Sequence, residues 1–294
     1  MPRSDKRDYL KAFLLVVFAG TIWSFGTLVV RYMEAPQNYQ WQYLFYRGMT
    51  VAALLLIYLL TREGFAVVDH FKRIGLAEFI GACGLVAAFS GYILSITVTT
   101  AANTLFMLAA APFIAAFLGI VLLQEKVRFI TWAAMIIAFF GIGVMVLEGL
   151  ETGKLFGGLI ALVSALGFAV FSVSLRFRRQ SPKFATIALA GLLCALFALL
   201  INFLGNDTLA MPFRNVYLSI LHGIIVGFGL ILYSLGSKIL PAAQLTLLSM
   251  VEVVGGVLWV YLPLFGIHEV PSGLTVIGGV IVLGAIVLDG VSTR

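Results

Sequence analysis

Residues 242–265 read AAQLTLLSMVEVVGGVLWVYLPLF, a stretch that is apolar and long enough to cross a lipid bilayer. One acid, Glu252, stands near its middle. A charged side chain at the centre of a bilayer costs at least about 2.5–3.5 kcal/mol, so it usually faces a cavity or a polar partner. Helical spacing places Ser249, Glu252 and Gly256 on one face. We therefore predict a membrane helix whose thin polar face serves a function.

The composition of the chain places it among integral membrane proteins. Of its 294 residues, 62% are hydrophobic and 11% are charged, and the mean hydropathy is +1.09. Soluble domains average about 45–50% apolar and about 25% charged residues, so a soluble fold of this length cannot hide so much apolar surface. The two cysteines, Cys83 and Cys194, lie inside apolar runs. They indicate packing positions and no disulfide framework.

Apolar runs of membrane-spanning length recur along the chain, and short polar breaks separate them. None of these breaks is long enough to fold as a separate domain. The run from 74 to 123 is about twice the length of one span, which places a boundary near Thr97–Thr100. The chain therefore predicts ten transmembrane helices, at residues 12–30, 42–60, 74–97, 100–123, 129–147, 155–175, 184–204, 216–237, 242–265 and 271–289.

The lysines and arginines indicate how these helices cross the membrane. If the N-terminus is cytoplasmic, most of the 19 basic residues fall at cytoplasmic helix ends, as the positive-inside rule requires. Arg31, Lys154 and Arg214 then lie outside. We therefore expect a multi-pass protein of the inner (plasma) membrane with both termini in the cytoplasm. The net charge of +6 follows from this topology, so we expect contact with the lipid bilayer and no nucleic-acid partner.

The two halves of the chain resemble each other weakly. A shift of 141 residues places 101–103 (Ala-Ala-Asn) on 242–244 (Ala-Ala-Gln), and a shift of 145 places Trp23 on Phe168. The matches suggest two five-helix halves, residues 1–150 and 151–294. Because five is odd, the second half must enter the membrane in the opposite orientation, as in many secondary transporters. The predicted fold class is an all-α integral membrane protein with ten transmembrane helices, arranged as two inverted five-helix repeats around a central cavity.

Several features of these halves resemble one family of transporters. Each half opens with an alanine-rich helix that carries an aromatic residue, Trp23 or Phe168. Arg47 stands near the outer start of the second helix, and the fourth-helix runs cover residues 109–125 and 250–269. These features resemble the EamA-type transporters of the drug/metabolite transporter superfamily, and among them the YddG-type exporters of aromatic amino acids. The resemblance covers the whole chain.

The resemblance implies a central cavity lined by helices 1, 3, 4, 6, 8 and 9, with helices 5 and 10 at the periphery. It also implies export from the cytoplasm. In transporters with inverted repeats, the small-molecule substrate binds near the bilayer midplane, between the halves. Pro112 lacks a backbone N–H and lies at mid-depth in the fourth helix, so it marks a place where a gate can flex.

Three polar residues inside the predicted helices are candidates for function. Glu252 either binds a substrate's amino group or a proton, or it is a structural carboxyl that fixes helix packing. Arg47 either pairs with a carbonyl or extends its charge toward the membrane surface, or it serves a substrate carboxylate or a gate. His222 is either a hydrogen-bonded packing residue or a proton site.

The aromatic residues divide by depth. Trp41 and Tyr43, among others, stand near the outer ends of helices, where interfacial belts occur. A second group lies deeper, where rings and a few polar groups make a small-molecule site, although core packing explains each residue alone. The predicted substrate-binding set is Trp23, Tyr92, Asn103, Met107, Phe168, Phe171, His222, Tyr233, Gln244, Ser249 and Glu252, with Arg47 and Pro112 as gating or structural residues.

Three functions compete for this chain. A secondary exporter of aromatic or amphipathic amino acids, or of related metabolites, accounts for the most features and would work by alternating access. A broad-specificity drug or cation exporter of the same fold is the alternative. An intramembrane enzyme needs paired acids or a nucleophile motif, which the sequence lacks, so we expect no enzyme. The sequence also predicts no metal site and no cofactor, and it does not indicate an oligomeric state.

Overall fold

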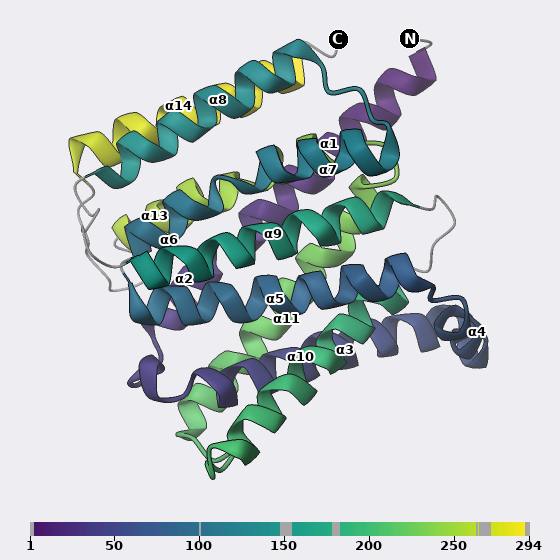
Figure 1. Cartoon of the computed structure of the whole chain (residues 1–294), viewed down its shortest axis with the longest axis vertical. Coiled ribbons are helices and arrows are strands. Elements are labelled where there is room, and N and C mark those ends of the chain that lie inside the picture. Colours follow the sequence, from purple (N-terminus) through teal and green to yellow (C-terminus); the bar gives the residue numbers. More distant parts are fainter. Residues whose placement is uncertain are drawn as a thin grey trace.

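The computed structural model of the protein describes residues 3–99, 101–147, 155–177, 183–262, 264 and 272–291. Within these ranges the regular structure is helical, and the helices form one bundle (Figure 1). The first half contributes α1 (Arg3–Trp23), α2 (Gly26–Arg31), α3 (Gln40–Glu63), α4 (Val67–Lys72), α5 (Leu76–Val98), α6 (Ala101–Leu108), α7 (Ala111–Leu123) and α8 (Phe129–Val146). The second half contributes α9 (Leu155–Phe177), α10 (Lys183–Leu204), α11 (Phe213–Gly236), α12 (Ala242–Ser249), α13 (Val251–Tyr261) and α14 (Gly273–Val291).

Nine helical segments within the described ranges are long and apolar enough to span a membrane. They coincide with nine of the ten predicted spans; α10, for example, begins one residue before the predicted span 184–204. The tenth predicted span, 242–265, contains the shorter apolar segment Ala242–Gly256, formed by α12 and the start of α13. The prediction of an all-α integral membrane protein is confirmed.

Three predicted spans are interrupted, which corrects the prediction of one continuous helix for each span. The first span divides into α1 and α2, the fourth into α6 and α7, and the ninth into α12 and α13. Pro112, next to the first residue of α7, explains the second break, because it has no N–H to donate to the carbonyl of Leu108. The backbone of α6 therefore cannot continue into α7 without a change of geometry.

The break between α12 and α13 has a different cause, because no proline stands there. The N–H of Met250 bonds to the carbonyl of Leu247, three residues back, instead of continuing the usual four-residue ladder. The hydroxyl of Ser249 donates to the carbonyl of Thr246 at 2.8 Å. Side-chain hydroxyls that bond back to a helix in this way bend it.

The breaks in the fourth and ninth spans lie at matching places. α6 ends at Leu108 and α12 ends at Ser249, which are separated by the same 141 residues that relate the two halves in the sequence. Irregular backbone at membrane depth is tolerated where protein buries it or where it lines a cavity. The paired breaks therefore point to a cavity between the halves.

The closest helix pairs join the two halves of the sequence. α5 packs on α9, α3 on α10 and α8 on α14, and α11 packs on both α1 and α3. Facing glycines allow this close approach: a methyl group on Gly48 would lie 2.8 Å from the carbonyl oxygen of Gly191, and one on Gly84 would lie 2.7 Å from that of Gly167. Small residues at crossings are typical of membrane helices, where van der Waals packing drives association.

The start of α1 and the end of α14 lie at the same end of the bundle (Figure 1). We call this end the terminal side; α7, α9 and α11 also end there. We call the other end, where α2, α5 and α8 end, the distal side. These two names describe the molecule alone and make no statement about the cell.

Candidate functional site

A cavity of about 660 Å³ begins in the middle of the bundle and extends toward the distal side. Its volume is in the range of about 300–1,000 Å³ that is typical of small-molecule sites. All six spans that the family resemblance places around a cavity contribute lining residues, and the distal ends of α8 and α14 contribute as well. The spans of α8 and α14 are therefore less peripheral than the resemblance implies. The predicted site residues in the lining are Trp23, Arg47, Tyr92, Pro112, Phe168, His222, Ser249 and Glu252.

Aromatic rings close the cavity toward the terminal side. Trp23 and Phe168 line it with their ring centroids 6.0 Å apart, in an edge-to-face arrangement of 77°. The indole N–H of Trp23 donates to the carbonyl of Val226 at 3.2 Å, which holds the ring in place. Tyr233 packs behind both rings, with its centroid 5.4 Å from each. A ligand with an aromatic ring therefore meets a wall that is already oriented for ring contacts.

Glu252 lines the cavity in the first turn of α13. The partial positive charge of a helix N-terminus favours an acid at this position. Its carboxylate interacts electrostatically with Arg47 and with Tyr92 across the cavity. Within the described part of the chain, this carboxylate forms no hydrogen bond and no ion pair, so both of its oxygens remain available to a ligand.

Arg47 lies inside the bundle and does not extend its charge to the membrane surface. The residue is 3% exposed and borders the cavity. Its guanidinium lies over the ring of Phe89, 4.5 Å from the centroid, and Nη1 donates to the hydroxyl of Tyr43 at 3.5 Å. Nε and Nη2 are buried and have no hydrogen-bond partner. Of the alternatives that the sequence left open for Arg47, extension toward the membrane surface does not hold, because α11 and α10 cover this part of α3.

Tyr43 and His222 form a buried pair beside Arg47. The hydroxyl of Tyr43 bonds to Nδ1 of His222, and Tyr43 is 2% exposed. The sequence prediction of Tyr43 as an interfacial residue is therefore wrong. The site analysis missed Tyr43 and Phe89, although Tyr43 stands one helical turn before Arg47, a spacing that places the two side chains on the same face.

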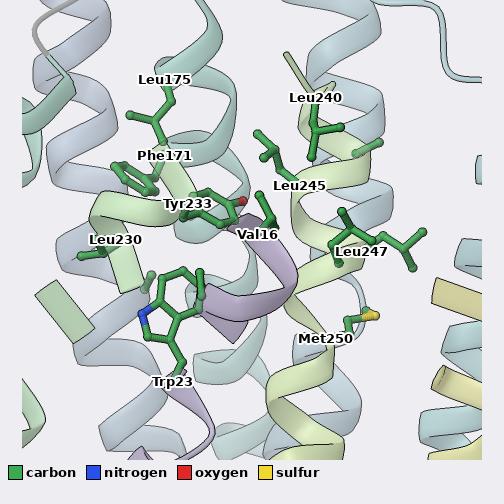
Figure 2. Packing of buried hydrophobic residues seen from close by; sticks show 14 of the residues in the cluster. Val16, Trp23, Phe171, Leu175, Leu230, Tyr233, Leu240, Leu245, Leu247 and Met250 are labelled. Carbon is green, nitrogen blue, oxygen red and sulfur yellow. The ribbon is translucent and has the colours of Figure 1, made fainter. Parts of the chain in front are cut away.

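Four of the predicted site residues that the structure describes do not line the cavity: Tyr233, Phe171, Met107 and Gln244. Tyr233 and Phe171 are fully buried behind Trp23 (Figure 2), and the hydroxyl of Tyr233 bonds to that of Ser172 at 2.7 Å. Met107 lies against α9, where its side chain faces Gly158. The side chain of Asn103 lies outside the part of the structure that is described. The fourth residue, Gln244, belongs to a separate network.

Gln244 holds helices together on the terminal side. Its amide donates to Asp289 of α14 and to the hydroxyl of Tyr9 of α1. Asp289 is fully buried and also accepts from Thr131 at 2.7 Å and from Arg128 at 3.1 Å. The prediction that Gln244 contacts substrate in the central cavity is therefore wrong for this structure, because its hydrogen bonds join α12 to α1 and α14, and Asp289 extends the network to α8.

A second polar network closes the bundle on the terminal side. Arg176 of α9 pairs with Glu125, which follows α7, and also donates to the carbonyl of Ser237 at 2.6 Å. The second oxygen of Glu125 accepts from the N–H of Ala242, the first residue of α12, at 3.0 Å. Lys183 donates to the hydroxyl of Ser237 at 2.8 Å. These bonds join α7, α9, α10, α11 and α12 where the cavity does not reach.

No group of three metal-ligating side chains occurs among the residues that the structure describes. The cavity instead combines rings and aliphatic side chains with a few polar groups. This makeup is typical of sites that bind small organic molecules.

Three comparisons relate this chain to known proteins. Residues 10–147 match the EamA-like transporter family. A crystal structure of another protein has the same fold, with a TM-score of 0.82 and 20% sequence identity, and the match covers 96% of this chain and 98% of that chain. The comparison with curated proteins finds no match. Over residues 10–147 the chain is therefore similar to the EamA-like transporter family, and its described residues form an all-helical membrane fold around a large central cavity.

Proposed function

We propose that the protein is a secondary transporter that exports aromatic or other amphipathic amino acids from the cytoplasm by alternating access. The observation that carries this proposal is the central cavity, in which Trp23 and Phe168 form a ring-bearing wall and Glu252 offers an unbonded carboxylate. A ring contact adds about 0.5–1.5 kcal/mol beyond simple burial, so one good contact ranks an aromatic side chain several-fold to about tenfold above alanine. The carboxylate of Glu252 can pair with the ammonium group of the same substrate.

The helix breaks support a binding site at this depth. In secondary transporters, discontinuous helices at matching positions of two repeats form the substrate site near the bilayer midplane. Here Leu108 and Pro112 at one break, and Ser249 and Glu252 at the other, all line the cavity. The sequence shift that relates the two halves and the positions of the helix breaks thus favour the same location for the substrate site.

We interpret residues 1–150 and 151–294 as two inverted repeats. The pairing of helices supports this interpretation, because the contact of α5 with α9 has its counterpart in α11 with α1, and that of α3 with α11 has its counterpart in α10 with α5. α3 packs on α10 and α8 packs on α14, as equivalent helices do across a two-fold axis. Alternating access then follows from a movement of one repeat against the other.

The charge pattern supports export across the inner (plasma) membrane. Most lysines and arginines lie at helix ends on the terminal side, so the positive-inside rule makes that side cytoplasmic and places both termini there. The cavity reaches the distal side, whereas Glu125 and Arg176 close the terminal side. In this topology the cavity extends toward the outside of the cell, the direction in which an exported substrate leaves.

A broad drug or cation exporter is the second candidate function, and Glu252 is the observation that favours it. A single unbonded acid in an apolar cavity also attracts hydrophobic cations. The two functions differ in their substrates, since a cation exporter needs no recognition of a carboxylate.

Transport by purified protein in liposomes tests both candidates. We expect labelled phenylalanine to accumulate, with tryptophan and tyrosine competing about tenfold better than alanine or glycine. If the aromatic amino acids compete no better than alanine while hydrophobic cations do compete, the cation exporter is the better description. A pH gradient across the same liposomes shows whether protons drive the transport.

A further inference from the structure

We propose that Arg47 binds the carboxylate of the substrate and that Arg47 and Glu252 together select molecules carrying both charges. This inference rests on the proposed function and narrows its substrate class to zwitterions. The two residues border the same cavity from opposite halves of the chain, Arg47 on α3 and Glu252 on α13. They interact electrostatically but form no direct ion pair. Arg47 and Glu252 are therefore opposite charges in one cavity that no ion pair joins; a second cation, Arg31, also lines this cavity.

The guanidinium of Arg47 lacks the acceptors that a buried arginine normally has. The residue is 3% exposed, yet Nε and Nη2 have no hydrogen-bond partner. Leaving donors of a charged group unsatisfied in a low-dielectric interior is unfavourable, so such groups usually pair or bind a ligand. A carboxylate supplies two acceptor oxygens that match the forked donors of arginine. A substrate carboxylate in the cavity would therefore provide what the surrounding residues do not.

Neighbouring side chains hold the guanidinium in position. Because arginine has donors only, the oxygen of Tyr43 accepts from Nη1, and the same hydroxyl forms a hydrogen bond with Nδ1 of His222. The ring of Phe89 lies beneath the guanidinium at 4.5 Å. These contacts orient Arg47 but offer no negative charge. Tyr43 and His222 are therefore positioning residues for the arginine.

The arrangement predicts one orientation of the substrate. The ammonium group lies toward Glu252, the carboxylate toward Arg47, and the ring toward Trp23 and Phe168. A molecule with only one charged group leaves either Arg47 or Glu252 without a partner in the cavity. Such unpaired buried groups are what allow a site to reject close analogues.

A comparison of ligands and variants tests this proposal. The ligands are phenylalanine, phenylalanine amide, which lacks the carboxylate, and 3-phenylpropionate, which lacks the ammonium group; binding and competition with labelled phenylalanine are both measured. We expect the wild-type protein to prefer phenylalanine at least tenfold over either analogue. Arg47→Gln should lose most of the preference over the amide and keep that over phenylpropionate. Glu252→Gln should show the reverse.

Two further variants keep the test interpretable. Arg62→Gln removes an exposed arginine from the end of the same helix and should leave both preferences unchanged. Arg47→Lys keeps the charge without the forked donors, so it should retain part of the preference over the amide even if Arg47→Gln does not fold. Thermal unfolding in detergent identifies variants that fail to fold.

The outcomes separate this inference from the proposed function. If wild-type protein binds and transports phenylalanine but accepts its amide equally well, the assignment of Arg47 is overturned and the proposed function stands. The same conclusion follows if folded Arg47→Gln weakens all three ligands by the same factor. If phenylalanine neither binds nor moves, the proposed function fails, and this inference fails with it.

Discussion

At the scale of single residues, we propose that Glu252 and the rings of Trp23 and Phe168, which line the same cavity, determine what it binds. Glu252 is an acid within a membrane span that makes no hydrogen bond or ion pair among the described residues, whereas Asp289 uses its carboxylate to join helices. Two acids within membrane spans thus have different environments. We propose that Glu252 contacts a ligand, whereas Asp289 joins helices.

Glu252→Gln should reduce transport of phenylalanine at least tenfold and change the melting temperature little. Glutamine keeps the volume of the side chain but removes the charge that attracts an ammonium group. Initial rates in liposomes and thermal unfolding in detergent measure the two effects separately. Normal rates in this variant, together with poor yield of Glu252→Leu, would show that the acid is structural.

Phe168→Ala should weaken competition by phenylalanine about tenfold and leave competition by alanine almost unchanged. The substitution removes one ring from the cavity wall, and a lost ring contact is worth up to about 1.5 kcal/mol. Phe203→Ala is a matched control, because Phe203 is 74% exposed on α10 and does not line the cavity. Equal losses for phenylalanine and alanine would contradict a direct ring contact.

At the scale of helices, the contacts between helix ends determine which side of the protein is closed. Glu125 connects the end of α7 to the start of α12 and to α9 through Arg176. Both halves of the proposed repeat therefore meet at one ion pair on the terminal side. Breaking a partly buried pair by removing one partner leaves the other charge uncompensated.

Arg176→Gln should favour opening of the terminal side. Leu245 is fully buried behind this network, so a cysteine at that position reports on opening. In a background with serine at positions 83 and 194, Leu245→Cys should react with a cytoplasmic alkylating reagent several-fold faster when Arg176→Gln is present. Lys238→Gln, an exposed cation on the same side, is the control. An unchanged labelling rate would show that Arg176 does not hold this side closed.

At the scale of the whole molecule, the charge distribution and the helix arrangement point to one topology. α1 begins and α14 ends on the same side of the bundle (Figure 1), as an even number of crossings requires. The basic residues concentrate at helix ends on that side. The positive-inside rule therefore predicts that the terminal side is cytoplasmic.

We expect a reporter protein fused after Arg294 to lie in the cytoplasm, so only reporters that function there should be active. A fluorescent protein that folds in the cytoplasm should light up, and a phosphatase that needs an oxidising compartment should stay inactive. The same pair of reporters placed after Gly205, at the distal end of α10, should give the reverse pattern. Equal signals at both positions would contradict the topology.

The amino-acid sequence by itself determined the membrane class, the positions of most spans and the resemblance to a family of transporters. Hydropathy is a sum over about twenty consecutive residues, so it needs no knowledge of neighbouring helices. The same reasoning located Glu252, because a charge inside such a span is conspicuous. Trp23 and Phe168 were also found from the sequence, through their equivalent places in the two halves.

Only the tertiary structure decided which polar residues share a cavity. Arg47 and Tyr43 stand near a helix end, where sequence favours the membrane interface, but α10 and α11 cover them. Gln244 aligns with Asn103 in the sequence, yet Asp289 and Tyr9 use its hydrogen bonds. The direction of a side chain around its helix depends on packing between segments far apart in the chain. The spans can therefore be predicted from the sequence alone. The lining of the cavity cannot, because it depends on that packing.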